Sequence, residues 1–404
     1  MQSCQNEPRM GKIPNWRERL SSERELVLYG ARPILGEASA SRFLEILHAP
    51  LNWPALVAFA HEHHVETFLF ENLILTGQEN VPGPWLERLR DSARKTAALA
   101  VLLSSELLRI HEIFEKEGVP LVPYKGPVLS WLAYGALTQR RFTDLDFFVP
   151  QKNISRAGAL LKSAGFISKI EIPTETVGHP GDIPGQYAFF REATRTQVEL
   201  HTERTLRYFP VPLNFEEMSR RLIPVELCGR TLRTFSIEDT LVMLCVHGAK
   251  HFWDRLLWIL DVAQLIKAHA VDWALLEKLA AKMESTRVVL FGLSLAHELF
   301  EAPLPGRLLE EMRRDPAIRK MAGKVYEGYA GVSDSATGVI PRAVFRVRMR
   351  DGIGRGLRHT LRLALSPTES DRENVRLPRW LSPLHMLVRP FRLLREYGSG
   401  LKRR

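Results

Sequence analysis

The sequence predicts an α+β fold, with a small mixed sheet flanked by N- and C-terminal helical regions. Apolar residues return every three or four positions before residue 118 and again after residue 236, as in amphipathic helices. Between these regions, short β-rich segments alternate with short helical ones, which is typical of a small α/β sheet. With 404 residues and 45% hydrophobic content, the chain is long enough for two or three packed units.

Four regions follow from these patterns: a helical region, an α/β core, a second helical region and a basic tail rich in Pro and Arg. They span residues 1–117, 118–235, 236–330 and 331–404.

The first helical region shows its periodicity in two stretches. Residues 52–74 (NWPALVAFAHEHHVETFLFENLI) carry apolar side chains at helical spacing, which predicts one amphipathic helix. Residues 85–117 contain no internal Gly or Pro, so a single long helix is expected there. Gly118 marks its end, because glycine commonly terminates helices.

The α/β core alternates strands with helices. In TDLDFFVP the acidic residues alternate with apolar ones, and this period of two places the carboxylates on one face of a strand. The predicted elements are strand 119–124, helix 128–137, strand 143–150, helix 154–166, and strands 187–191 and 196–201. Together they form a mixed sheet.

The second helical region begins at Ser236, which with Asp239 three residues later resembles a capping box. From Leu241 to about His269 the amphipathic pattern is continuous, and further helices are expected to about residue 330.

The tail holds the net charge of +10. From residue 341 onward, 16 Lys and Arg face five Asp and Glu, so the first 340 residues are close to neutral. Such a tail suits nucleic acid, an acidic membrane surface or an acidic partner, and equally a solvated helix face. Residues 331–375 are expected to be loop or loosely helical, and Pro378, Pro383 and Pro390 allow only short helices beyond them.

Targeting signals are not evident in the sequence. The N-terminus is polar, and no uncharged apolar run approaches the roughly 20 residues needed to cross a bilayer. Cys4, Cys228 and Cys245 are scattered and form neither a disulfide framework nor a zinc site. A cytoplasmic protein is expected, with Cys228 and Cys245 as core residues.

Three carboxylates carry the chemistry that the sequence predicts. Asp144 and Asp146 project from the same side of one strand, where their like charges would repel strongly without a cation. Glu199, on another strand, would join them if the two strands are neighbours. Hard carboxylate oxygens suit Mg²⁺ or Mn²⁺, and two such ions can clamp the attacking and leaving oxygens of a phosphoryl displacement.

An Asp-x-Asp pair alone is weak evidence, but a phosphate-binding turn precedes this one. Lys125 and Gly126 stand between a strand and a helix. Glycine lets the backbone approach phosphate oxygens, the helix N-terminus favours anions, and the lysine adds a full positive charge.

These parts, in the order VPYKGPVLSWLAYG, RRFTDLDFFVP and VELH, resemble the nucleotidyltransferase superfamily, and more closely its branch of uncharacterised nucleotidyltransferase family proteins. The resemblance runs from about residue 40 to 300 and rests on Lys125-Gly126, an Arg before the Asp-x-Asp, and Glu199-Leu200-His201. Better-known relatives have Gly-Ser at the turn and a shorter spacing to the first Asp. The third carboxylate is often Asp in this branch.

A second landmark of the branch is HGAKHFWDRLLWILDVA. On one helix His247, Lys250, Asp254, Trp258 and Asp261 would share a face. That face could close over a nucleotide, with Lys250 near phosphate and Trp258 or His247 near the base. Alternatively, its polar residues simply hydrogen-bond neighbouring helices. His247 and His251 lack an evident third zinc ligand.

Further polar residues have two interpretations each. Arg140 and Arg141 would stabilise triphosphate charge if their loop folds over the site, or would lie in a solvated loop. His201 is expected on the side of Glu199, where it orients that carboxylate or contacts phosphate. The histidines at 61, 63 and 64 are interpreted as a polar helix edge.

The resemblance implies transfer of a nucleoside monophosphate from a nucleoside triphosphate to a hydroxyl acceptor, a small molecule or protein, with release of pyrophosphate. Asp144, Asp146 and Glu199 would bind the metal and catalyse; Lys125, Gly126, Arg141 and Lys250 would bind the nucleotide. Two alternatives stay open: a catalytically degenerate fold that serves as a scaffold, and an RNA-directed transferase that uses the basic tail. RNA is less favoured, because no aromatic platform accompanies the tail's arginines.

Overall fold

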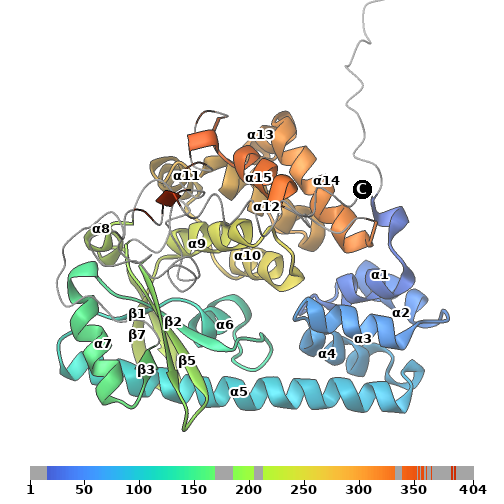
Figure 1. Cartoon of the computed structure of the whole chain (residues 1–404). Helices are drawn as coiled ribbons and strands as arrows, with labels where there is room; N and C mark the ends of the chain where they lie inside the picture. Colours follow the sequence, from blue (N-terminus) through green and yellow to red (C-terminus); the bar gives the residue numbers. More distant parts are fainter. Residues whose placement is uncertain are drawn as a thin grey trace, which may run out of the picture.

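The computed structural model describes residues 16–168, 185–203, 213–332 and 339–352, with isolated residues between 354 and 387. It is a mixed α+β fold with a five-stranded sheet flanked by helices, as predicted (Figure 1). The prolines at 378, 383 and 390, Cys4 and most of the basic tail lie outside the described residues.

The N-terminal region is helical. It contains η1 (Trp16–Arg19), α1 (Ser22–Gly30), α2 (Glu37–Leu47), α3 (Trp53–Glu62), α4 (Glu66–Thr76), η2 (Gln78–Asn80) and α5 (Gly83–Lys116). The single helix predicted over 52–74 is wrong, because the chain breaks between α3 and α4, where His64 takes a positive φ of 59°. The long helix is confirmed, and Gly118 follows it with φ +62°.

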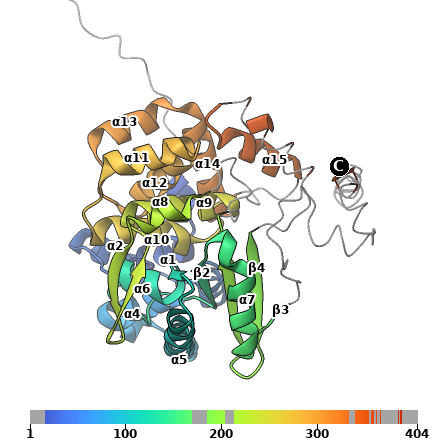
Figure 2. The same cartoon turned by 90° about the vertical axis from the view of Figure 1, so that its left-hand side faces the viewer.

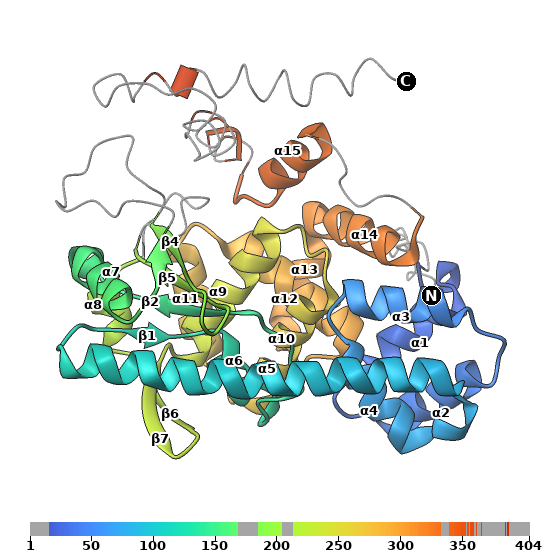
Figure 3. The same ribbon diagram turned by 60° about the horizontal axis from the view of Figure 1, so that its bottom comes forward.

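Helix α5 joins the two ends of the molecule. Its 34 residues span about 51 Å at 1.5 Å per residue. It runs along the α1–α4 group at one end and beneath the sheet at the other (Figures 1 and 3).

The sheet has the order β1-β2-β5-β4-β3, and the β2–β5 pair is parallel while its other pairs are antiparallel. Two helices, α6 and α7, connect its first three strands along the chain. The elements are β1 (Val122–Pro123), α6 (Gly126–Tyr134), β2 (Asp144–Phe148), η3 (Gln151–Asn153), α7 (Ile154–Ser163), β3 (Ile167–Ser168), β4 (Gln186–Arg191) and β5 (Thr196–His201).

A hairpin that the sequence did not predict follows the sheet. After the short helix α8 (Phe215–Ser219), β6 (Ile223–Leu227) pairs with β7 (Arg230–Thr234). Cys228 and Gly229 make its turn with φ values of +50° and +75°, and positive φ at both central residues is typical of a type I′ hairpin turn. The prediction of a core Cys228 is therefore wrong, since its side chain is exposed, whereas Cys245 is buried.

The C-terminal region is helical from Ile237 onward, and Ser236 caps the first helix by accepting a hydrogen bond from the backbone of Asp239. The helices are α9 (Ile237–Lys250), α10 (Leu256–Ala268), α11 (Trp273–Lys282), α12 (Thr286–Phe300), α13 (Gly306–Arg314), α14 (Pro316–Ala330) and α15 (Val339–Arg348). Figure 2 shows the layers from the side, with α11 and α13 at the top, α9 and α10 below them and α5 nearly end-on at the bottom.

The predicted continuous helix from Leu241 to His269 is wrong. The chain breaks between α9 and α10, where Phe252 and Trp253 take φ values of +60° and +55°. Trp253 is fully buried, and its ring lies so close to Gly248 and Gly292 that a Cβ atom on either would clash. Burial of this indole outweighs the cost of two left-handed residues, of order 1–3 kcal/mol each.

Among the described residues, the buried apolar side chains form two cores. One lies between the sheet, α7 and the second half of α5. The other is shared by α1–α4 and the C-terminal helices α9–α14. The N- and C-terminal regions therefore pack together although the α/β core separates them in the chain; the predicted region boundaries stay a prediction.

Helix α15 is regular and lies within residues 331–375, for which loop or loose helix was expected. Among the described residues, no helix is both long and apolar enough to pass through a bilayer.

Candidate metal and nucleotide site

The strands β2 and β5 bring the predicted carboxylates together. Because the two strands are parallel neighbours, Asp146 pairs in register with Glu199. Side chains two residues apart share a face of a strand, so Asp144 lies on the face of Asp146, and His201 on that of Glu199. All four side chains line one cavity of about 410 Å³.

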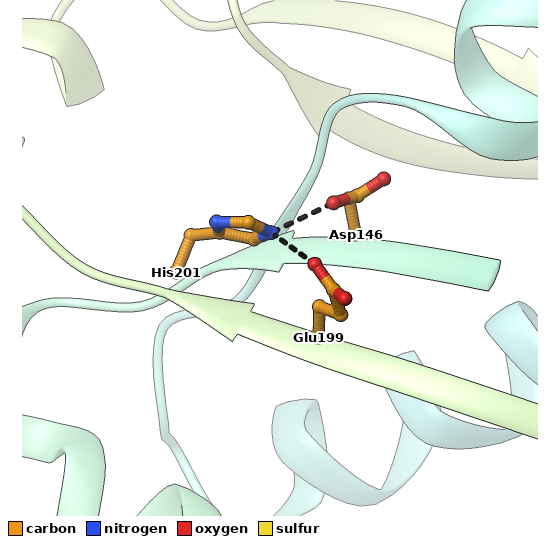
Figure 4. Close-up of side chains that lie close together, drawn as sticks. All are labelled: Asp146, Glu199 and His201. Atoms are coloured by element: carbon orange, nitrogen blue, oxygen red, sulfur yellow. Dashed lines mark hydrogen bonds and ion pairs between the residues drawn. The ribbon is translucent and has the colours of Figure 1, made fainter. Parts of the chain in front are cut away.

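His201 lies between two of the carboxylates. Its Nε2 is 2.7 Å from Asp146 Oδ1 and 3.5 Å from Glu199 Oε2, and the side chain is 4% exposed (Figure 4). Sequence reasoning predicted a secondary role for this histidine beside Glu199, because only the strand register shows that it also reaches Asp146.

Three of these residues form a possible metal-binding group. Ligand atoms of Asp146, Glu199 and His201 lie within 4.8 Å of one another. Asp144 lies outside this group but lines the same cavity. The carboxylate oxygens are donors that fit Mg²⁺ or Mn²⁺, whereas an imidazole nitrogen is a softer donor.

The carboxylates differ in their electrostatics. Burial, together with the charges of Asp146 and Glu199, raises the pKa of Asp144 from 3.8 to about 6. Burial would also raise the pKa of Asp146, but the charge of Lys125 and the hydrogen bond from His201 outweigh it and hold that pKa below its usual value. For Glu199, burial is likewise outweighed by the His201 hydrogen bond, and the pKa is lowered. The donor set thus carries mutual repulsion that a cation would relieve.

The turn before α6 supplies a positive charge beside the carboxylates. Lys125 is the N-cap residue of α6, and its Nζ lies 3.5 Å from Asp146 Oδ1. Gly126 takes φ +53°, and a Cβ atom there would lie 3.2 Å from the carbonyl oxygen of Asp144. The positive φ and the close approach of this turn to β2 together favour glycine at this position.

Two glutamines that sequence reasoning missed hold Glu199. Gln186 Nε2 donates to its Oε2 at 2.6 Å, and Gln197 Nε2 donates to its Oε1 at 3.1 Å. Gln186 comes from β4, the other neighbour of β5, so only the strand order shows this contact.

The ends of α9 and α10 form another wall of the cavity. His247, Lys250, Asp254 and Trp258 line it, although the helix break separates them. Asp261 is absent from the lining: it is fully buried. The prediction that the five residues share one face of a single helix is thus wrong, because they lie on two helices and the connection between them. Four of the five nevertheless line the cavity.

Arg140 and Arg141 both line the cavity but differ in their burial and their ion-pair partners. Arg140 is buried and donates two hydrogen bonds to Asp261, at 2.7 and 2.8 Å, so its charge is compensated within the protein. Tyr134 donates a third hydrogen bond to Asp261. Arg141 lines the cavity and is held by Glu66 at 3.2 Å.

The histidines at 61, 63 and 64 are not a uniform polar edge. His61 is largely exposed and contacts Glu66, His63 is buried against Phe59, and His64 lines the cavity. Burial, with nearby arginine charges, lowers the pKa of both His63 and His64 to about 3.

The fold and the acidic site beside basic side chains agree with the class of protein that the chain resembles. The chain belongs to the family of uncharacterised nucleotidyltransferases, whose model matches residues 49–301. A crystal structure of an antigenic nucleotidyltransferase-like protein from Paracoccidioides brasiliensis is similar over 53% of this chain and 96% of its own, with 14% identity and a TM-score of 0.27. No curated protein matches the chain.

Proposed function

We propose that the protein is a metal-dependent nucleotidyltransferase that transfers a nucleoside monophosphate from a nucleoside triphosphate to a hydroxyl acceptor, a small molecule or protein. The observation that carries this proposal is the in-register pairing of Asp146 with Glu199 on parallel strands, beside Asp144 and Lys125 in one cavity. Acidic residues beside basic ones suit a metal-bound polyphosphate better than either charge alone.

In this proposal Asp144, Asp146 and Glu199 hold Mg²⁺ or Mn²⁺. The bound ion would offset phosphate charge and polarise the phosphoryl oxygens. The nucleotide phosphates would contact Lys125, the backbone at Gly126, Arg141 and Lys250, which come from different walls of the cavity.

The transfer forms one bond and breaks another. The acceptor oxygen bonds to the α-phosphorus, the bond from that phosphorus to the bridging oxygen breaks, and pyrophosphate leaves. The hydroxyl proton passes to Glu199 or to solvent.

Calorimetric titration tests the proposal. Non-hydrolysable analogues of the four nucleoside triphosphates are titrated, with Mg²⁺, into the wild type and into Asp144→Ala/Asp146→Ala. We expect Mg²⁺-dependent binding that is lost in the double variant. Glu87→Ala/Asp91→Ala is the matched control, since it removes two exposed carboxylates from α5.

A folded wild type that binds none of the four analogues would contradict the proposal and favour the scaffolding role instead. An acceptor screen follows only after binding is found, with transfer of label from the α-phosphate as its readout.

A further inference from the structure

Three rings form a cluster on the helical wall of the cavity. The ring centroids of His247 and His251 lie 4.9 Å apart, and they lie 5.1 and 5.0 Å from that of Trp258. We call these three residues the ring cluster. All of them line the cavity that holds the carboxylates, and Trp258 is partly exposed, whereas the neighbouring Trp253 is fully buried in the core.

We propose that the ring cluster is the subsite for the nucleobase of the nucleotide. This inference rests on the proposed function, because it assumes that the phosphates bind beside Asp146 and Lys125. A nucleobase has flat π faces and polar edges, so it fits an indole face bordered by imidazole nitrogens.

The location suits that role. Lys250 is the last residue of α9 and directly precedes His251, so a proposed phosphate contact adjoins the ring cluster in the chain. His247 lines the same cavity as Lys125 and Asp146, so the ring cluster and the carboxylates face a common space. In this proposal one nucleotide contacts both the carboxylates and the ring cluster, which line the same cavity.

The imidazoles are uncharged at neutral pH. Burial, followed by the charge of Lys250, lowers the pKa of His251 to about 4. Burial also lowers the pKa of His247 well below its usual value. A neutral imidazole offers one donor and one acceptor nitrogen to a base edge, and it leaves phosphate binding to the lysines.

Metal binding is the competing interpretation of two histidines in one cavity. Among the residues that the structure describes, the group of three potential ligands contains His201 but neither His247 nor His251. The ring cluster thus lacks the third donor that a structural zinc site needs.

The experiment compares nucleotides with inorganic tripolyphosphate, which has the phosphates but no base. Trp258→Leu removes the π face and keeps an apolar side chain, while Trp258→Phe keeps a smaller ring. Trp85→Leu is the matched control, because Trp85 is also partly buried and also has an arginine over its ring, at 5.6 Å against 5.2 Å for Trp258. Circular dichroism confirms that each variant is folded.

We expect the wild type to bind at least one Mg²⁺-nucleotide analogue more tightly than Mg²⁺-tripolyphosphate. Trp258→Leu should weaken nucleotide binding roughly 10- to 100-fold, the effect of one stacked base, and leave tripolyphosphate binding unchanged. Trp258→Phe should recover part of the loss, and Trp85→Leu should bind like the wild type.

Equal affinity of the wild type for nucleotide and tripolyphosphate, or unchanged nucleotide binding in Trp258→Leu, would overturn the base subsite while leaving the phosphate and metal assignments intact. If the wild type binds neither probe, the proposed function fails and the base subsite fails with it.

Discussion

At the scale of single residues, the candidate site is a balance of charges. Asp146 is compensated by Lys125 and His201, whereas the pKa of Asp144 is raised by burial and by its neighbours' charges. Two carboxylates on one strand therefore have opposite effects on the stability of the metal-free protein. This contrast is typical of sites that bind a charged ligand, where stability is lost for function.

Asp144→Asn should stabilise the metal-free protein and abolish transfer. Because the native pKa of Asp144 is about 6 and its usual value is 3.8, ionisation costs the native state stability as pH rises through this range. The variant should gain about 3 kcal/mol of unfolding free energy near pH 8 and less than about 1 kcal/mol near pH 4. Denaturant unfolding at both pH values, with EDTA present, measures this.

Asp146→Asn is the internal comparison for that prediction. It removes the partner of Lys125 and His201, so it should lower the unfolding free energy under the same conditions. A similar shift in both variants would show that the two carboxylates do not differ as inferred.

At the scale of elements, the turn between β1 and α6 depends on glycine at position 126. Gly126 combines a positive φ with close approach to β2, whereas Gly118 has a positive φ and open space around it. Substitution of Gly118 therefore tests the effect of backbone conformation alone, whereas substitution of Gly126 tests conformation and packing together.

Gly126→Ala should lower the unfolding free energy by about 1–2 kcal/mol and also weaken Mg²⁺-nucleotide binding, since β2 must shift to admit the methyl group. Gly118→Ala should cost about 1 kcal/mol and leave binding unchanged. Thermal unfolding and calorimetric titration of both variants test this, and equal binding by the two would contradict it.

The buried ion pair of Arg140 and Asp261 links the loop before β2 to α10. Arg140→Met should lower the unfolding free energy by about 3–5 kcal/mol, because it leaves Asp261 charged and buried. Arg140→Met/Asp261→Leu should be less destabilised than the single variant, and denaturant titration compares them. If the loss of unfolding free energy in the double variant equals the sum of the losses in Arg140→Met and Asp261→Leu, the two residues are not coupled.

Much of this fold could be predicted from local pattern. The alternation in TDLDFFVP identifies β2, and the absence of Gly and Pro in residues 85–117 identifies α5. Periodicity could not predict the helix breaks, because they are made by ordinary residues such as His64 and Trp253, held in left-handed conformations by tertiary packing. The site followed the same division: the carboxylates were predicted, whereas His201 between them depends on strand register.

At the scale of the whole molecule, buried neutral histidines connect the helical regions. His63 packs on Phe59 from its own helix and on Tyr329 from α14, and its backbone oxygen accepts a hydrogen bond from Leu257. Its low pKa is due first to burial and then to the charge of Arg24.

Stability should therefore fall with acidification below about pH 6.5. The native pKa of His63 is about 3 and the unfolded value is 6.5, so the unfolded state gains a proton that the native state excludes. The stability is therefore full above pH 6.5, the pKa of the unfolded state, and it is lost as pH falls. For His63 this loss of unfolding free energy reaches about 2 kcal/mol near pH 5. His63→Phe should make the decline shallower in denaturant unfolding across this range; an unchanged slope would contradict the assignment.

Helices α1–α4 leave the ribosome long before the helices that complete their core. About 240 residues separate the end of α4 from the start of α14. At roughly 5–20 residues per second, their synthesis takes about 10–50 s. During that time part of the shared core is not yet synthesised. The N-terminal helices contribute Leu26, Val27 and Phe43 to that core, and α14 contributes Ile318, Met321 and Tyr326. We therefore expect a chaperone to bind the exposed apolar side chains at the N-terminal end of the nascent chain. The helical core is expected to be completed only when the last third of the chain has emerged from the ribosome.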